Sequence, residues 1–249
     1  MNPMADAVAE LEAEQKGLES LLRELTREQW FLQTPAAGWD VRDQVSHLAD
    51  VEEIAYDTAT GGVRQLNVEA LTYPSPEAFT QAGVDKGRSK EPEELIAWLE
   101  AGSGKLRAKF FEMDPKERVP WGLGMSARTL VTARLMEWWA HGLDIRTAVG
   151  EPPNVTERLK SVVWLIVNAL PYAFSVAGIE KPGGTLRVEL DYNGETWTFG
   201  PEDADNRITG DALEFCKIGV QRLNRDEAQT IKAVGPLAEA ALTHARAFL

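Results

Sequence analysis

Apolar side chains recur every three to four residues in four long segments of the first 150 residues, and this spacing is typical of amphipathic helices. Prolines and glycines separate the segments, as in "TPAAGWD" before the second segment and "GG" after it. Helices of this length joined in sequence favour an antiparallel four-helix bundle. The segments predicted to be helical are residues 5–30, 41–60, 91–113 and 127–149.

Capping signals mark the ends of these segments. Asp40 is the expected N-cap of the second segment, and Asp43 adds negative charge in its first turn. Pro92 stands near the first helical position of the third segment. Ser126 is the expected N-cap of the fourth segment, which Gly150 ends. The connections predicted to be mostly loop are residues 62–90, with one short helix, and residues 114–126.

After residue 150 the sequence changes to a mixture of helix and strand signals. The segment "VTERLKSVVWLIVNALPYAFSVAG" is predicted to be a buried helix that is kinked or broken near Pro171. Apolar and polar residues alternate around "NG" in "GGTLRVELDYNGETWTFG", which indicates a β-hairpin. "RITGDALEFCKIGVQRL" indicates a strand followed by a helix, and "PLAEAALTHARAFL" a final helix. We therefore expect an α+β fold, with the bundle over residues 1–150 and a smaller α/β module over residues 151–249.

Charge and composition exclude several classes of protein. The net charge of −13 repels a phosphate backbone, and no basic cluster offsets it, so we expect no nucleic-acid partner. There is no run of 18 apolar residues and the acidic N-terminus lacks the apolar core of a signal peptide, so we expect no membrane segment. A single cysteine, Cys216, excludes an internal disulfide and fits a cytoplasmic protein.

The segment "RLMEWWAHGLDIR" contains the residues with the most distinctive chemistry. Glu137 and His141 are four residues apart, so on a helix their side chains point to the same side. A divalent cation accepts imidazole nitrogen and carboxylate oxygen together, and His47 in the second helix is the available third ligand. Two histidines and one glutamate would leave coordination positions open, as in catalytic sites. A simple hydrogen bond between Glu137 and His141 is the ordinary alternative.

Several neighbours of these residues are candidates for supporting roles. Arg134 shares the face of Glu137 and His141, where it would pair with a substrate carboxylate or form a salt bridge to a neighbouring helix. Asp144 and Asp50 each follow a candidate histidine by three residues, and either would orient an imidazole or remain a solvated carboxylate. Asp144 is also a candidate base. The remaining marked residues are expected to have structural roles: Trp138, Trp139 and Cys216 in packing, and His244 at the surface.

Two segments resemble the mycothiol-dependent maleylpyruvate isomerase family, which belongs to the DinB-like metal-binding four-helix bundles. They are "GWDVRDQVSHLADVE" and "VPWGLGMSARTLVTARLMEWWAHGLDIRTAVG". The resemblance covers residues 5–150 and implies a divalent metal, usually zinc, held by His47, Glu137 and His141. The remainder of the chain is similar, more loosely, to the C-terminal module of this family, which resembles sterol carrier proteins.

The resemblance also implies a reaction class. Family members use low-molecular-weight thiols, chiefly mycothiol, the actinobacterial counterpart of glutathione. We therefore expect a metal-dependent enzyme that activates mycothiol, its co-substrate, for isomerisation of a small electrophile or for S-transfer to it. A thiol that coordinates the metal would lose its proton and become the nucleophile. The sequence does not choose between the two reactions, or between a monomer and a homodimer.

Two other classes of function remain open from the sequence. The same ligand set with a bound water would serve a metal-dependent hydrolase, which would act on simple esters or amides without a thiol. Alternatively, the C-terminal module would bind a small apolar ligand or lipid and the bundle would be non-catalytic. A transcription regulator is disfavoured because the chain lacks a basic recognition helix.

Overall fold

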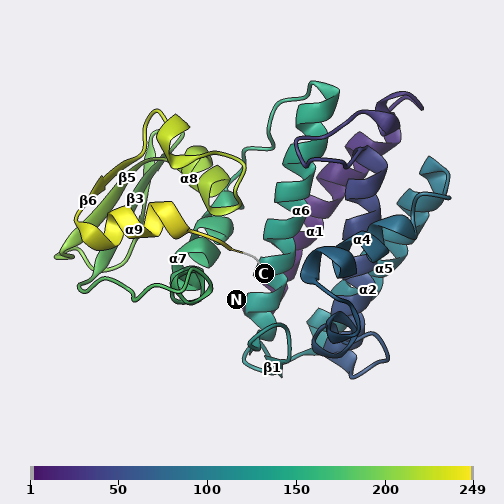
Figure 1. Ribbon diagram of the computed structural model, residues 1–249, viewed down its shortest axis with the longest axis horizontal. Helices are drawn as coiled ribbons and strands as arrows, with labels where there is room; N and C mark the ends of the chain where they lie inside the picture. Colours follow the sequence, from purple (N-terminus) through teal and green to yellow (C-terminus); the bar gives the residue numbers. More distant parts are fainter. Residues whose placement is uncertain (1–2, 248–249) are drawn as a thin grey trace. The chain divides into compact units, whose positions relative to one another are not determined.

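The computed structural model describes residues 3–247. The chain divides into two compact units, with the boundary in the sequence between Asn154 and Val155. The first unit is mainly helical and the second combines a sheet with helices, so the fold is α+β (Figure 1). The elements of the first unit are α1 (Pro3–Glu24), η1 (Gln29–Phe31), α2 (Val41–Thr60), α3 (Leu66–Glu69), η2 (Ala70–Thr72), α4 (Pro76–Asp85), α5 (Pro92–Glu112), β1 (Arg118–Val119), β2 (Met125–Ser126) and α6 (Ala127–Val149).

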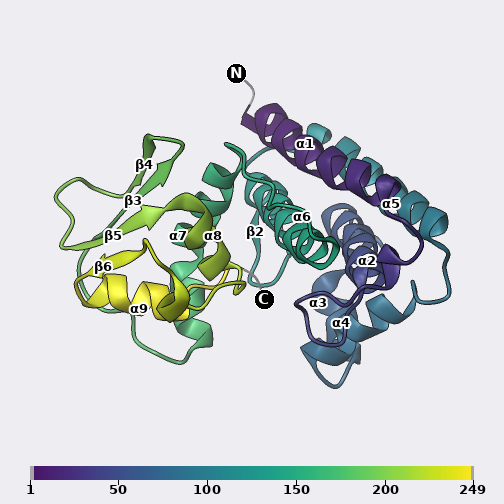
Figure 2. The same cartoon turned by 90° about the horizontal axis from the view of Figure 1, so that it is seen from above.

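The four long helices α1, α2, α5 and α6 pack side by side around one core (Figure 2). Helices α2 and α6 run antiparallel, since Gln44 contacts Asp144 while Glu52, two turns later, contacts Arg134. The shorter helix α4 runs back along α2, so that Arg88 reaches Asp43 near the start of α2. As a result α5 begins beside the start of α2 and runs in the same direction, and the bundle contains one crossover connection.

The ends of α2 and α6 confirm the capping signals in the sequence. Asp40 and Asp43 form a reciprocal capping box at the start of α2. Gly61 then ends α2 with a φ of 71°, in the left-handed region that glycine adopts readily. The Ser126 side chain accepts a hydrogen bond at the start of α6, and Gly150 ends that helix with a φ of 80°. These two helices carry the candidate metal ligands.

The connections contain more regular structure than the sequence analysis predicted. The first helix ends at Glu24 rather than near residue 30, because Thr26 and Gln29 bond to each other and start the separate turn η1. The second connection, predicted to contain one short helix, contains α4, which Ser75 caps and which has a proline at its first position, and in addition α3 and η2. The segment before α6, expected to be loop, contains the short antiparallel pair β1 and β2.

The second unit contains a four-stranded sheet made of β3 (Leu186–Tyr192), β4 (Glu195–Phe199), β5 (Asn206–Asp211) and β6 (Lys232–Val234), in the order β4–β3–β5–β6. The expected hairpin of β3 and β4 is confirmed, with positive φ at Asn193 and Gly194 in its turn. Strand β5 pairs parallel to β3, and β6, which the sequence analysis did not predict, pairs antiparallel to β5. The helices of this unit are α7 (Leu159–Val176), α8 (Ala212–Gly219), η3 (Arg225–Glu227) and α9 (Pro236–His244).

Helix α7 continues through Pro171 and is not broken there. Among the described residues it is long and apolar enough to cross a membrane by length and composition. It packs against α8, α9 and β4, and side chains such as Val162, Ile166 and Phe174 are buried. A buried core helix passes the same test of length and composition, so α7 is weak evidence for a span. The predicted final helix ends at His244, and residues 248–249 lie outside the described residues.

Substitutions at Gly102 and Gly104 of α5 can test how closely this helix packs against α2. A Cβ atom at Gly102 would lie 3.2 Å from the Cβ of Glu52, whereas one at Gly104 would meet no atom within 4 Å. We expect Gly102→Leu to lower the free energy of unfolding by about 1–3 kcal/mol through overpacking. Gly104→Leu should raise it by about 0.5–1 kcal/mol through helix propensity. Chemical denaturation measures both, and equal stability of the two variants would contradict the close packing.

Candidate metal centre

The structure brings His47, Glu137 and His141 together: the spacing in the sequence predicted the pairing of Glu137 with His141, and His47 is the candidate third ligand from the second helix. Each offers one possible ligand atom, and these atoms all lie within 4.8 Å of one another. His47 comes from α2, and Glu137 and His141 come from adjacent turns of α6. Two imidazole nitrogens and one carboxylate oxygen suit zinc and similar divalent cations. The donor set therefore fits a metal, and the ligand role of the three residues stays a prediction.

The three side chains form a compact, partly buried group. His141 Nε2 lies 3.2 Å from Glu137 Oε2, and the two imidazole rings are 4.6 Å apart between centroids. The Trp39 ring lies beside both histidines, at centroid distances of 5.2 Å from His47 and 6.3 Å from His141. Trp39 belongs to the loop before α2, so this loop forms one wall of the site.

The charge state of Glu137 favours cation binding. Burial by itself would raise the pKa of this carboxyl group. The hydrogen-bonding contact with His141 and the positive charges that His141, Arg134 and His47 can carry outweigh burial and lower the pKa to about 2. Glu137 is therefore an anion at neutral pH and contributes the negative charge of the site.

Gln44 is a neighbour of the site that the sequence analysis missed. Its Oε1 lies 2.6 Å from His141 Nδ1, and its Nε2 donates to Thr34 Oγ1 at 2.8 Å and to Asp144 Oδ2 at 3.4 Å. Gln44 precedes His47 by three residues on α2, which was the available signal in the sequence. The Asp144 carboxylate is thus linked to the His141 imidazole through the Gln44 amide.

Arg134 occupies a different environment from the one expected of a substrate-binding residue. Its guanidinium forms a buried ion pair with Glu52 of α2, at 3.0 Å, and the two side chains are 2% and 0% exposed. Trp138 Nε1 donates to the same Glu52 oxygen at 2.7 Å. The salt bridge to a neighbouring helix, the second alternative for Arg134, is therefore the one observed, and its positive charge is already matched by a protein carboxylate.

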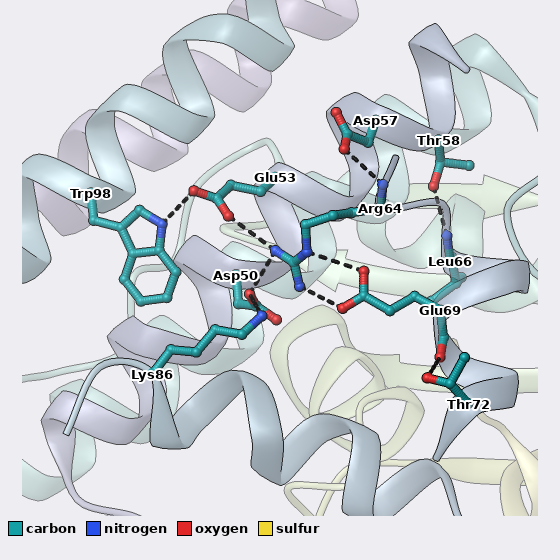
Figure 3. Close-up of polar contacts among 10 residues, drawn as sticks. All are labelled: Asp50, Glu53, Asp57, Thr58, Arg64, Leu66, Glu69, Thr72, Lys86 and Trp98. Carbon is teal, nitrogen blue, oxygen red and sulfur yellow. Dashed lines mark hydrogen bonds and ion pairs between the residues drawn. The ribbon is translucent and has the colours of Figure 1, made fainter. Parts of the chain in front are cut away.

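Asp50, considered as a residue that would orient the His47 imidazole, has other partners. Figure 3 shows its carboxylate beside Arg64 and Lys86, each of which approaches Asp50 Oδ1 to 2.8 Å. Arg64 further pairs with Glu53 and Glu69, and so ties α2 to α3. The hydrogen bonds to Glu69 and Asp50 raise the pKa of Arg64, against the opposite effect of burial. Asp50 thus joins the α2–α4 connection and is bonded to cations rather than to His47.

The remaining residues singled out in the sequence, two tryptophans, the cysteine and the third histidine, lie in packed surroundings. Trp138 and Trp139 are buried, and Trp139 Nε1 donates to the carbonyl of Asn154. Cys216 is buried in the second unit, where burial and then the charge of Asp211 raise the pKa of its thiol. His244 is half-buried in the same unit, with its ring 6.4 Å from that of Phe174. Cys216 is accordingly a packing residue and a poor nucleophile.

The protein is a helical bundle that carries two histidines and a glutamate on facing helices, followed by an α/β unit. Residues 11–146 match the family model described as the mycothiol maleylpyruvate isomerase N-terminal domain. This match covers more than half of the chain, so the protein belongs to that family. The resemblance seen in the second and fourth helices is thereby confirmed.

Relatives and solved structures agree with this assignment. The uncharacterized proteins Rv0036c and MT0041 from two strains of Mycobacterium tuberculosis are each 34% identical over 243 residues, covering 97% of this chain and 94% of theirs. Two structures of mycothiol-dependent maleylpyruvate isomerase, one with a histidine replaced by alanine, superpose with TM-scores of 0.63 and 0.61. They share 14% and 15% identity and cover 94% of this chain and 95% of theirs, which shows a common fold.

The buried pair of Glu52 and Arg134 can be tested by stability. We expect Arg134→Met to lower the free energy of unfolding by about 3–5 kcal/mol, because it leaves the Glu52 carboxylate buried without a counter-charge. The double variant Glu52→Gln/Arg134→Met should recover much of this loss, since the neutral amide oxygen at position 52 can still accept from Trp138. Denaturant titrations measure both. A stable Arg134→Met protein with impaired substrate binding would instead support the substrate role.

Proposed function

We propose that this protein is a divalent-metal-dependent enzyme that uses a low-molecular-weight thiol to transform a small electrophile. The observation that carries the proposal is the convergence of His47, Glu137 and His141, with possible ligand atoms within 4.8 Å of one another. Two neutral imidazoles and one carboxylate give the site a net charge of −1, which attracts a cation. Three protein ligands leave room for an exogenous group, as in catalytic rather than structural zinc sites.

The ligand set suits activation of a thiol that comes from outside the protein. A divalent cation bound there would lower the pKa of a coordinating thiol, so that the reactive thiolate forms near neutral pH. The chain's own Cys216 cannot take this part, because its buried thiol donates to the Leu159 carbonyl and has a raised pKa. The Trp39 ring beside the imidazoles would shield the reacting sulfur from water on one side.

The identity of the thiol and of the reaction is proposed from the family. The structural neighbours are named for mycothiol dependence and for maleylpyruvate isomerisation. We therefore propose mycothiol as co-substrate and zinc as the metal, with isomerisation of a small electrophile or S-transfer to it as the reaction. A thiol-dependent enzyme of this kind would work in the reducing cytoplasm.

The alternative of an apolar-ligand carrier gains no support from the second unit. An open depression of about 500 Å³ on the surface of this unit has the charged residues Glu189, Asp191 and Asp211 among those that line it. Such a lining does not suit a lipid tail. The likeness of this unit to sterol carrier proteins stays a prediction.

Metal content is the first test of the proposal. We expect the protein, purified without an affinity tag, to carry about one equivalent of a divalent metal, because the three ligands form one site. His47→Ala and the double variant Glu137→Ala/His141→Ala should lose it while keeping their helical circular dichroism. His244→Ala removes the remaining histidine, in the second unit, and should keep the metal. Elemental analysis measures this, and a metal-free wild type after reconstitution would refute the proposal.

Thiol dependence separates the proposed reaction from hydrolysis. Turnover of maleylpyruvate, or conjugation of small electrophiles, should require both the metal and mycothiol, and glutathione should substitute poorly. The metal-free His47→Ala protein should lose at least about 100-fold in rate, as expected when the group that activates the nucleophile is removed, and His244→Ala should match the wild type. Product analysis by chromatography follows both reactions. Metal-dependent cleavage of simple esters or amides without any thiol would favour a hydrolase instead.

A further inference from the structure

The side chain of Gln44 lies at the centre of a buried chain of hydrogen bonds that ends at His141. Gln44 is 0% exposed and Asp144 1%, and Thr34 and His141 are also buried. In such surroundings each polar group needs a partner, because a buried donor or acceptor without one keeps the full cost of its removal from water. The direction of every hydrogen bond in the chain can therefore be worked out from groups that can only accept.

The far end of the chain is the carbonyl oxygen of Trp39, which can only accept. Thr34 Oγ1 donates to it at 2.9 Å, so this hydroxyl has no second proton and must accept from Gln44 Nε2. The Asp144 carboxylate likewise accepts from Gln44 Nε2. Both protons of the Gln44 amide nitrogen are thereby used, and the amide oxygen faces His141.

The reversed amide would lose these bonds. Gln44 Oε1 would then lie beside a carboxylate oxygen of Asp144, and the Thr34 hydroxyl could not serve both Gln44 and the Trp39 carbonyl. The amide orientation is therefore set by Thr34, Trp39 and Asp144. It requires His141 to carry a proton on Nδ1, because the group that Nδ1 meets there is the acceptor Gln44 Oε1, at 2.6 Å.

The consequence appears on the other side of the ring. With its proton on Nδ1, the neutral His141 ring has a lone pair on Nε2, which lies 3.2 Å from Glu137 Oε2. Two acceptors at this distance repel each other unless a positive charge lies between or beside them. The alternative tautomer, with the proton on Nε2, would satisfy Glu137 with a simple hydrogen bond and leave Nε2 unable to bind a cation.

We propose that Gln44 is a positioning residue that holds His141 in the Nδ1-protonated tautomer and so keeps Nε2 available as a metal ligand. The metal part of this inference rests on the proposed function, whereas the tautomer part does not. Thr34 is itself held in place, because its backbone N–H also bonds to the Trp39 carbonyl and Gln33 pairs with Asp40. The loop that contributes the Trp39 wall therefore also supports the histidine tautomer.

Nitrogen NMR of the metal-free protein tests the tautomer directly. Long-range ¹H–¹⁵N spectra, recorded at a pH where the rings are neutral, report which nitrogen of His141 carries the proton. We expect Nδ1–H in the wild type and a shift toward Nε2–H in Gln44→Leu, which has no acceptor for Nδ1. Gln44→Glu keeps an acceptor oxygen for Nδ1 when its other oxygen, which would face Asp144 and Thr34, is protonated, and should then keep the Nδ1–H tautomer. The matched control is Gln15→Leu, another fully buried glutamine, which lies on α1 and pairs with Arg107.

Zinc affinity, measured by competition with a chromophoric chelator, tests the consequence. We expect a loss of about 10- to 100-fold in Gln44→Leu, typical of removing a group that orients a ligating histidine, and little change in Gln15→Leu. Gln44→Glu should lose less affinity than Gln44→Leu, and Thr34→Val should show a smaller loss of the same kind. Circular dichroism confirms that each variant is folded.

The outcomes separate the two proposals. An unchanged His141 tautomer in Gln44→Leu, or equal zinc affinity in Gln44→Leu and Gln15→Leu, would overturn the role of Gln44. If the wild type binds no metal, the proposed function fails, yet the tautomer spectra still decide whether Gln44 controls the ring. If Gln44→Leu does not fold, Gln44→Met decides it, because methionine also lacks an acceptor for Nδ1 and an unchanged Nδ1–H tautomer in that variant would contradict the proposal.

Discussion

The antiparallel contact between α2 and α6 is the constraint on which the site depends. Two buried polar links cross this contact. Glu52, which follows His47 on α2, binds Arg134 and Trp138. Gln44, which precedes His47, binds His141 and Asp144. Each link forms only in one register of the two helices. A shift of one turn, about 5.4 Å, would break both links and separate His47 from the residues on α6.

This arrangement explains why the interior of the bundle contains charge where an apolar contact would suffice for stability. A buried ion pair often contributes little net stability compared with well-packed apolar side chains. It does specify one alignment, because an uncompensated charge in the core is costly. In this protein the specified alignment is the one that brings one residue of α2 and two of α6 within reach of a single cation.

The same physical argument applies to the comparison with the solved structures. At 14–15% identity most side chains differ, yet the fold is shared over 94% of the chain. Core packing tolerates many apolar exchanges as long as volume and pattern are kept. A polar cross-link such as that of Gln44 tolerates far fewer, because each donor and acceptor must be matched. The relatives from Mycobacterium tuberculosis, at 34% identity, are the natural proteins in which to look for the same polar links.

Local chemistry determined much of this structure. The capping residues Asp40 and Ser126 and the glycines 61 and 150 set the ends of α2 and α6 at the predicted positions, and "NG" set the β3–β4 turn. The proximity of Glu137 to His141 follows from the period of a helix, and the α+β class from the change of pattern after residue 150.

Only the tertiary structure decided which residues from distant segments meet. The partner of Arg134 lies 82 residues away at Glu52, and that of His141 lies 97 residues away at Gln44. A sequence pattern predicts the face of a helix on which a side chain lies, but it does not predict which helix packs against that face. The connection through α4 brings Arg64 and Lys86 to Asp50 of α2, and it depends in the same way on contacts between segments that are far apart in the chain.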